Sequence, residues 1–278
     1  MRAYISIDME GMPYIVSSEH LDIKGALFRE AREIATKVVN IVCEELHKEG
    51  FEEIIVADSH GSMVNIDVMK LPEYVSLIRG FPRPTSMVIG VEEADIVLFL
   101  GYHAKFGTQE ATFDHTYSGA VIRKIEINGI EASEYLLNAY VAGHFGRPVV
   151  LVAGDEALLE DDVKRHTPWA IRVPLKRSYS RYSARSPSMA KIESALRDGV
   201  RNAIKKYREG EMRPLKAEYP IDMRITFRNT AFADVAAYLP NSERLDGLTV
   251  RYVAKDIIES YKVLELLSLA TFALRRGI

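Results

Sequence analysis

The chain has 278 residues, of which 47% are hydrophobic and 27% are charged, and its formal net charge is −3. These values are typical of a folded, water-soluble protein that can bury a core without disulfides. The slight negative charge provides no field that would attract nucleic acid or an anionic membrane. The single cysteine, Cys43, excludes a disulfide framework, a thiolate zinc cluster and a paired redox motif.

No apolar run approaches the roughly 20 residues that span a bilayer, and the N-terminus lacks the pattern of a secretory signal peptide. We therefore expect a cytoplasmic protein whose partners include neither a membrane nor nucleic acid.

The first 155 residues alternate short β-branched runs with amphipathic stretches, which predicts βαβ units. Buried strands are expected at residues 4–7, 53–57, 96–100 and 148–153. Between the first two, residues 25–49 repeat apolar side chains at helical spacing and end at Gly50, which predicts a crossover helix. The expected fold class is therefore α/β, with a mostly parallel central sheet flanked by helices.

A strand at 120–127 and a helix at 133–145 are also expected in this first part of the chain. Ser and Arg then become dense from 167 to 188, and the residues after 170 predict a smaller C-terminal α+β portion. Further elements are expected as helices at 189–209 and 257–275 and as strands at 223–227 and 249–254. This change predicts an α/β metal-binding catalytic domain at 1–170 and a portion at 171–278 that serves oligomerisation. A single domain with a late extension is the alternative.

Residues that can bind metal follow three of the predicted strands. Asp8 and Glu10 follow the first, Asp58 and His60 the second, and His103 the third. Because the carboxyl ends of parallel strands share one edge of a sheet, these side chains are expected to converge there. Oxygen and nitrogen donors without thiolate suit hydrolytic zinc, manganese or cobalt, and four or five of them suffice for two ions sharing a carboxylate.

Each of these residues also has an ordinary structural interpretation. Asp8 and Asp58 are at positions where aspartate commonly caps a turn, and Glu134 is favoured in the first turn of a helix by the helix dipole. His115 lies in a stretch without periodicity, which is typical of an exposed loop. The basic, tyrosine-rich segment 176–182 could stack on bases, but on an acidic chain it is more typical of a solvated or intersubunit loop.

At these residues, and along essentially its whole length, the chain resembles the D-aminopeptidase family of zinc peptidases. The resemblance is carried by the segments Ser6-Ile7-Asp8-Met9-Glu10-Gly11, Asp58-Ser59-His60, Phe99-Leu100-Gly101-Tyr102-His103-Ala104, Asp114-His115, Glu134 with Leu137-Asn138-Ala139-Tyr140, and Val152-Ala153-Gly154-Asp155.

The resemblance implies two zinc ions per subunit and a homo-oligomer, a decamer arranged as a double ring. It implies hydrolysis of short peptides with N-terminal D-amino acids by a metal-activated water, with His115 as a further catalytic residue. It places Asp8 as the bridge between the ions in a ligand set of Asp8, Glu10, His60, His103 and Glu134. Two alternatives stay open: another two-metal hydrolase, such as an amidase or phosphoesterase, and a non-catalytic oligomeric module that binds metal or ligand.

Overall fold

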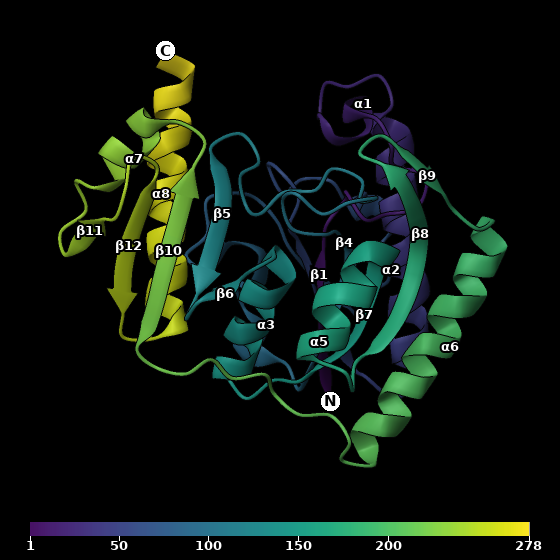
Figure 1. Cartoon of the computed structure of the whole chain (residues 1–278). Coiled ribbons are helices and arrows are strands. Elements are labelled where there is room, and N and C mark those ends of the chain that lie inside the picture. The colour runs from purple at the N-terminus through teal and green to yellow at the C-terminus, as the bar shows by residue number, and fades with distance from the viewer. Residues whose placement is uncertain (278) are drawn as a thin grey trace.

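The computed structural model describes residues 1–277, and its largest element is a seven-stranded sheet (Figure 1). The strand order is β3-β2-β1-β4-β7-β8-β9, and the six strands from β3 to β8 run parallel, while β9 pairs with β8 in the antiparallel sense. The bounds are β1 Arg2–Ile7, β2 Glu53–Asp58, β3 Val75–Ile78, β4 Ile96–Tyr102, β7 Val149–Asp155, β8 Ile171–Ser180 and β9 Ser183–Arg185.

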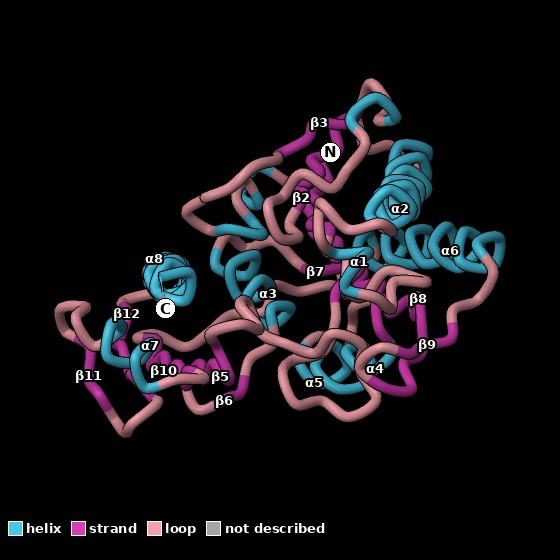
Figure 2. The backbone as a smooth tube through the Cα atoms, turned by 90° about the horizontal axis from the view of Figure 1, so that it is seen from above, coloured by secondary structure: helices cyan, strands magenta, loops and turns pink. Residues whose placement is uncertain are grey.

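Helices cover both faces of this sheet, which explains why its central strands are apolar without interruption. Figure 2 shows α2 (Phe28–Lys48) and α6 (Met189–Arg208) on one side and α3 (Glu134–His144) on the other. In β1, Ile5 and Ile7 point to the cluster with α2 and α6, whereas Tyr4 points to the cluster that includes α3. The alternation of side chains along the strand therefore supplies two hydrophobic cores.

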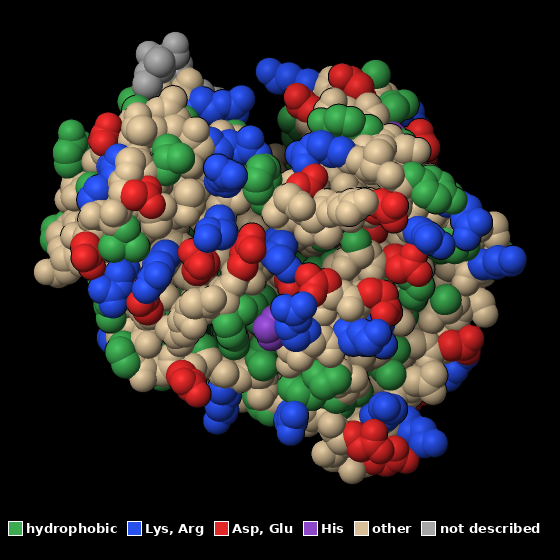
Figure 3. Space-filling model, viewed as in Figure 1, with side chains coloured by type: hydrophobic (Ala, Val, Ile, Leu, Met, Phe, Trp, Pro, Cys, Tyr) green, Lys and Arg blue, Asp and Glu red, His purple; other side chains and the backbone are tan. Residues whose placement is uncertain are grey.

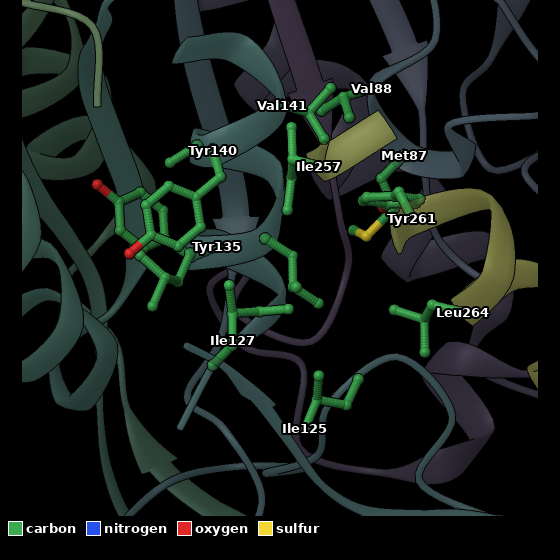
Figure 4. Close-up of a cluster of buried hydrophobic side chains, with 14 of the residues drawn as sticks. Met87, Val88, Ile125, Ile127, Tyr135, Tyr140, Val141, Ile257, Tyr261 and Leu264 are labelled. Carbon is green, nitrogen blue, oxygen red and sulfur yellow. The ribbon is translucent and has the colours of Figure 1, made fainter. Parts of the chain in front are cut away.

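A second sheet of five antiparallel strands has the order β11-β12-β10-β5-β6. Its strands are β5 Ile122–Ile127, β6 Ile130–Glu131, β10 Ile221–Phe227, β11 Ser242–Arg244 and β12 Thr249–Ala254. The C-terminal helix α8 (Ile257–Gly277) packs between this sheet and α3, and α7 (Thr230–Ala236) lies beside it. Figure 4 shows Tyr261 and Leu264 of α8 in one cluster with Ile125, Ile127 and Val141.

Short helical segments connect these elements. They are α1 Ser18–Leu21, η1 Val68–Lys70, η2 Ser86–Val88, η3 Val91–Glu93, α4 Glu156–Leu158, η4 Leu159–Val163 and α5 Lys164–His166. Within residues 1–277, no helix combines the length and apolarity that crossing a bilayer requires.

The α/β fold class and all the strands and helices predicted above are confirmed, with ends shifted by a few residues. The strands β3, β6, β8, β9 and β11, the helices α1, α4, α5 and α7 and the η segments were not predicted. The interpretation of residues 176–182 as a loop is wrong for 176–180, which belong to β8, where Lys176 is buried. Tyr179 and Tyr182 are exposed to solvent. Pro174 and the charged residues of β8 hide its apolar alternation.

Sheet membership does not follow the expected division at residue 170. β8 and α6, from beyond that point, belong to the seven-stranded sheet and its cover, whereas β5 and β6, from before it, belong to the second sheet. The division into two folding units, with oligomerisation assigned to the second, stays a prediction.

Gly101 allows β4 to lie against the residues that follow β1. It has a φ of +74° within an irregularity of the β4 pairing, and a Cβ added to it would overlap the carbonyl oxygen of Asp8. Beside it, the Asp8 amide donates to the Leu100 carbonyl at 2.8 Å, and the Gly11 amide donates to the Gly101 carbonyl at 2.7 Å. Glycine at this position therefore sets where Asp8 lies.

Gly101→Ala is expected to destabilise the protein more than Gly107→Ala, its matched control. Gly107 has a φ of +83° with no atom close to its missing Cβ, so alanine there should cost only the left-handed backbone, about 1–2 kcal/mol. At Gly101 the overlap with Asp8 should add about 1–3 kcal/mol. Denaturant unfolding measures both, and an equal loss in the two variants would contradict the role assigned to the close approach.

Candidate metal centre

Three strands and one helix bring the predicted metal ligands to one edge of the large sheet. Asp8 follows β1 directly, His60 follows β2 by two residues, and His103 follows β4 directly. Glu134 is the first residue of α3, a position fixed by Ser133, whose side chain accepts a hydrogen bond from the Leu136 amide. Glu10 lies in the turn after Asp8, and all five predicted ligands are buried.

Asp8 lies at the centre of the group, with its two carboxylate oxygens facing different partners. Its Oδ1 is 3.3 Å from His60 Nδ1, which is also 2.8 Å from Glu10 Oε2. Its Oδ2 is 3.4 Å from His103 Nε2, which is also 3.7 Å from Glu134 Oε1. Asp8 therefore lies between two groups of donors that overlap. Glu10 contacts His60, and its carboxylate also lies within 4.8 Å of Asp8 and His103, whereas Glu134 groups with His103 and His115.

His115 lies beside His103 and Glu134. Its Nε2 is 3.3 Å from Glu134 Oε1, and its ring stacks on that of His103 with centroids 4.4 Å apart and planes 18° apart. It is half-buried and borders the cavity in front of the group, so the interpretation as an exposed loop histidine is wrong.

The three histidines share one pattern of hydrogen bonding to the backbone. The ring nitrogen away from the carboxylates lies near a carbonyl oxygen in each: Leu21 for His60 at 3.1 Å, Ala104 for His103 at 3.0 Å, and Phe113 for His115 at 2.8 Å. A carbonyl only accepts, so these nitrogens carry the hydrogen and the lone pair of the other nitrogen in the neutral ring faces the carboxylates. This is the arrangement in which protein histidines bind metal.

Two buried atoms at the centre have no hydrogen-bond partner among the described residues, namely Asp8 Oδ2 and His103 Nε2. Both present lone pairs, and burying them face to face is unfavourable unless a cation lies between them. Donors about 2.0–2.1 Å from a tetrahedral zinc lie roughly 3.3 Å apart, close to three separations found here, of 3.3, 3.4 and 3.7 Å. The fourth, between His60 Nδ1 and Glu10 Oε2, is 2.8 Å, which is a hydrogen-bond distance. The residues therefore fit a metal.

The charges of the group also favour bound cations. Burial, together with the charges of Glu10 and Glu134, raises the pKa of Asp8 well above its usual range. Burial lowers the pKa of His103, and the charge of His115 acts in the same direction, so His103 is held neutral with its lone pair available. Against the effect of burial, Glu10 and Asp8 raise the pKa of His60 well above its usual range, so a positive charge is favoured at its Nδ1.

Asp58 follows β2 as Asp8 follows β1, yet it does not join the group. Its carboxylate accepts hydrogen bonds from the Asn65 and Ile66 amides and from the Asn65 side chain. It therefore organises the turn between residues 58 and 66, which is the ordinary interpretation of an aspartate after a strand.

Lys176 contacts the backbone next to the predicted metal ligands, although the sequence analysis placed it in a loop. Its ammonium donates to the carbonyl oxygens of Glu10 and Ile15, and burial lowers its pKa to about 8. The Tyr117 amide, also unpredicted, donates to Glu134 Oε1 at 2.6 Å. These contacts come from distant parts of the chain, and only the alternation of Val173 and Leu175 could have indicated a strand at Lys176.

The group forms one wall of a cavity of about 700 Å³, a volume typical of small-molecule sites. The space-filling view shows the surface hollowed at the top, between the side of the C-terminal helix and the side of α1 (Figure 3). A small substrate can therefore reach the group.

The comparisons with known proteins identify the family of the chain. A model of the D-aminopeptidase family matches residues 1–266. The D-aminopeptidase of Bacillus subtilis (strain 168) is 32% identical over 266 residues, which cover 95% of each chain. The solved structure of DppA from Bacillus subtilis, a Zn-dependent D-aminopeptidase and self-compartmentalizing protease, covers 98% of each chain with a TM-score of 0.93 and 31% identity.

These matches extend over almost the whole chain, in sequence and in three dimensions, and are not limited to one motif. This chain belongs to the D-aminopeptidase family, and it is a peptidase, as its sequence predicted.

Proposed function

We propose that this chain is a zinc-dependent aminopeptidase that removes N-terminal residues, D-amino acids among them, from short peptides at a two-metal site. One observation carries the proposal: the two oxygens of the buried Asp8 face two different histidines, His60 and His103, beside the buried carboxylates of Glu10 and Glu134. The zinc dependence and the D-aminopeptidase activity named for the Bacillus subtilis relative support it.

In this proposal Asp8 would help to hold both ions. Glu10 and His60 would hold one ion and His103 and Glu134 the other, because His60, which contacts Glu10, lies beside Asp8 Oδ1, and His103, which lies near Glu134, is beside Oδ2. When bound, zinc supplies Lewis-acid chemistry that acidifies water toward neutral pH and polarises a carbonyl group. The backbone carbonyls of Leu21 and Ala104 orient His60 and His103 for this task.

His115 is the residue that moves protons in the proposed reaction. Its Nδ1 is tied to the Phe113 carbonyl, which leaves Nε2 directed toward Glu134 and the cavity. Hydrolysis adds water to the peptide carbonyl and releases an amine that must gain a proton. Histidine is suited to carry that proton near neutral pH, and a protonated ring would also stabilise the oxyanion of the tetrahedral intermediate.

The proposal extends to assembly and location. The self-compartmentalizing relative supports a homo-oligomer of this chain. A ring of ten subunits, which the resemblance implies, and a cytoplasmic location, expected from the sequence, complete the proposal.

Chelation is expected to abolish peptidase activity, and added zinc should restore it in the wild-type protein but not in Asp8→Asn. The substitution keeps the shape of the side chain but removes the charge that both donor groups share. Asp198→Asn, an exposed position on α6, is the matched control and should be restored like the wild type. Full activity of the metal-free protein on short peptides would exclude the proposed chemistry.

His115→Ala should keep its zinc but lower kcat by roughly 10²–10⁴-fold, the usual contribution of a proton-transferring residue. Metal analysis and steady-state kinetics on the same sample measure both. His144→Ala, at the exposed end of α3, is the control. His115 could also form a donor set with His103 and Glu134, so loss of one zinc ion from His115→Ala would show that it is a ligand instead.

A further inference from the structure

The C-terminal helix α8 is part of the cavity, although its apolar sequence suggested scaffold. Glu265, Ser268, Leu269 and Phe272 share one face of α8 and line the same cavity as residues of the candidate metal centre. Tyr261, one turn before Glu265, donates from its hydroxyl to Asn138 Oδ1 of α3 at 2.7 Å. Because Asn138 is one turn after Glu134, this bond fixes α8 relative to the metal ligands.

Glu265 presents a buried carboxylate to this cavity. Only 7% of the residue is exposed, and one carboxylate oxygen, Oε2, accepts a hydrogen bond from the Tyr117 hydroxyl. The other oxygen, Oε1, is buried and makes no well-aligned hydrogen bond with the described residues, although the Ser86 side chain is close enough to lower the pKa of the carboxyl. A buried acceptor of this kind is unfavourable unless something else binds to it.

Glu45 shows how the same fold treats a buried carboxylate with a structural role. It is 4% exposed and is paired with Arg197 at 3.2 Å and with Arg201 at 2.5 Å. No Lys, Arg or His nitrogen lies within 4.0 Å of the Glu265 carboxylate among the side chains that the structure describes. The charge of the buried Arg83 acts on Glu265 from beyond ion-pair distance. Glu265 therefore lacks the directly paired cation that buried acids usually have.

Tyr117 connects this carboxylate to the metal centre. Its amide donates to Glu134 Oε1 and its hydroxyl to Glu265, so Tyr117 spans the cavity wall between the two carboxylates. Ser86 and Met87, near Glu265 in the same cavity, are buried, whereas Phe81 is 48% and Phe272 is 37% exposed. Glu265 thus lies at the deep end of the cavity, and the two phenylalanines lie at its mouth.

We propose that Glu265 forms the closed end of the subsite for the N-terminal residue of the substrate and selects a basic side chain there. The inference rests on the proposed aminopeptidase function. The peptide beyond the scissile bond must leave through the open mouth, so the deep end receives the side chain of the first residue. Met63, Met87 and Leu269 in the wall suit the methylenes of such a side chain, and Glu265 Oε1 suits its terminal ammonium.

The free energy of unfolding of the protein without substrate should show that Glu265 does not stabilise the fold. Burial raises the pKa of Glu265 to about 7, while Ser86 and the charge of Arg83 oppose this shift. A carboxyl whose folded pKa is raised loses stability as pH rises from its unfolded value of about 4.5 to about 7. Glu265→Gln should therefore stabilise the protein at pH 8 and give little gain at pH 4, as measured by denaturant unfolding at the two values.

The selectivity test uses the zinc-loaded protein at pH 8 with the tripeptides Lys-Gly-Gly and norleucine-Gly-Gly, each with a D- or L-residue first. The two side chains have the same length of carbon chain and differ in the ammonium. A charge-assisted hydrogen bond predicts that wild type prefers lysine in kcat/KM by on the order of 10- to 100-fold. Glu265→Gln should reduce this ratio to about one- to threefold.

Glu259→Gln is the matched control on the same helix. Its carboxylate accepts from the Tyr252 hydroxyl at 3.0 Å and from the Lys255 amide at 2.8 Å, and it does not line the cavity. It should keep the wild-type ratio.

A wild type that cleaves both peptides equally, or a Glu265→Gln variant that keeps the preference, would overturn the inference and leave the aminopeptidase function intact. Failure of the wild type to release the first residue from any of the four peptides would instead contradict the proposed function itself, and the inference with it.

Discussion

The site depends on one electrostatic constraint: three carboxylates, those of Asp8, Glu10 and Glu134, are buried together at the edge of a parallel sheet. Their mutual repulsion in a poorly solvated place is relieved only by positive charge. The neighbouring histidines direct lone pairs, not hydrogens, toward these oxygens when neutral. The protein thus holds in place an arrangement that bound cations complete, and this makes the proposed metal site a consequence of packing as well as of ligand type.

The surrounding structure is built to keep Asp8 in this position. Gly101 lets β4 approach the Asp8 backbone, and the Lys176 ammonium binds the carbonyl of Glu10 from beneath. Behind them, the Ser6 hydroxyl contacts the Ser59 and Tyr102 hydroxyls at 3.0 and 2.7 Å. These polar contacts lie within the buried core, where a displaced partner would leave an unsatisfied group. A shift of any one strand is therefore opposed by several others.

Much of this arrangement was predictable from sequence because it follows chain-local patterns. Apolar runs that end in Asp8, His60 and His103 indicate both the strands and their shared edge. Asp58 also ends an apolar run, but its carboxylate accepts hydrogen bonds from the Asn65 and Ile66 amides. The loop that brings these amides to Asp58 has no recognisable sequence pattern, so this role could not be predicted. The sequence did not single out Glu265, because it lies in an apolar helix. The only indication was one acidic residue among leucines on the buried face.

The same polar contacts extend to α8 and decide how the cavity can select a substrate. The Tyr102 hydroxyl accepts from Asn138 Nδ2 at 2.9 Å, and Asn138 Oδ1 accepts from the Tyr261 hydroxyl. A continuous chain of buried hydrogen bonds thus joins β1, next to Asp8, to the helix turn that carries Glu265. Because both ends are fixed to one core, the distance from metal centre to Glu265 is set before a substrate arrives. Selection by such a cavity depends on the length and charge of the substrate side chain, since little ordering of the protein remains to be driven by binding.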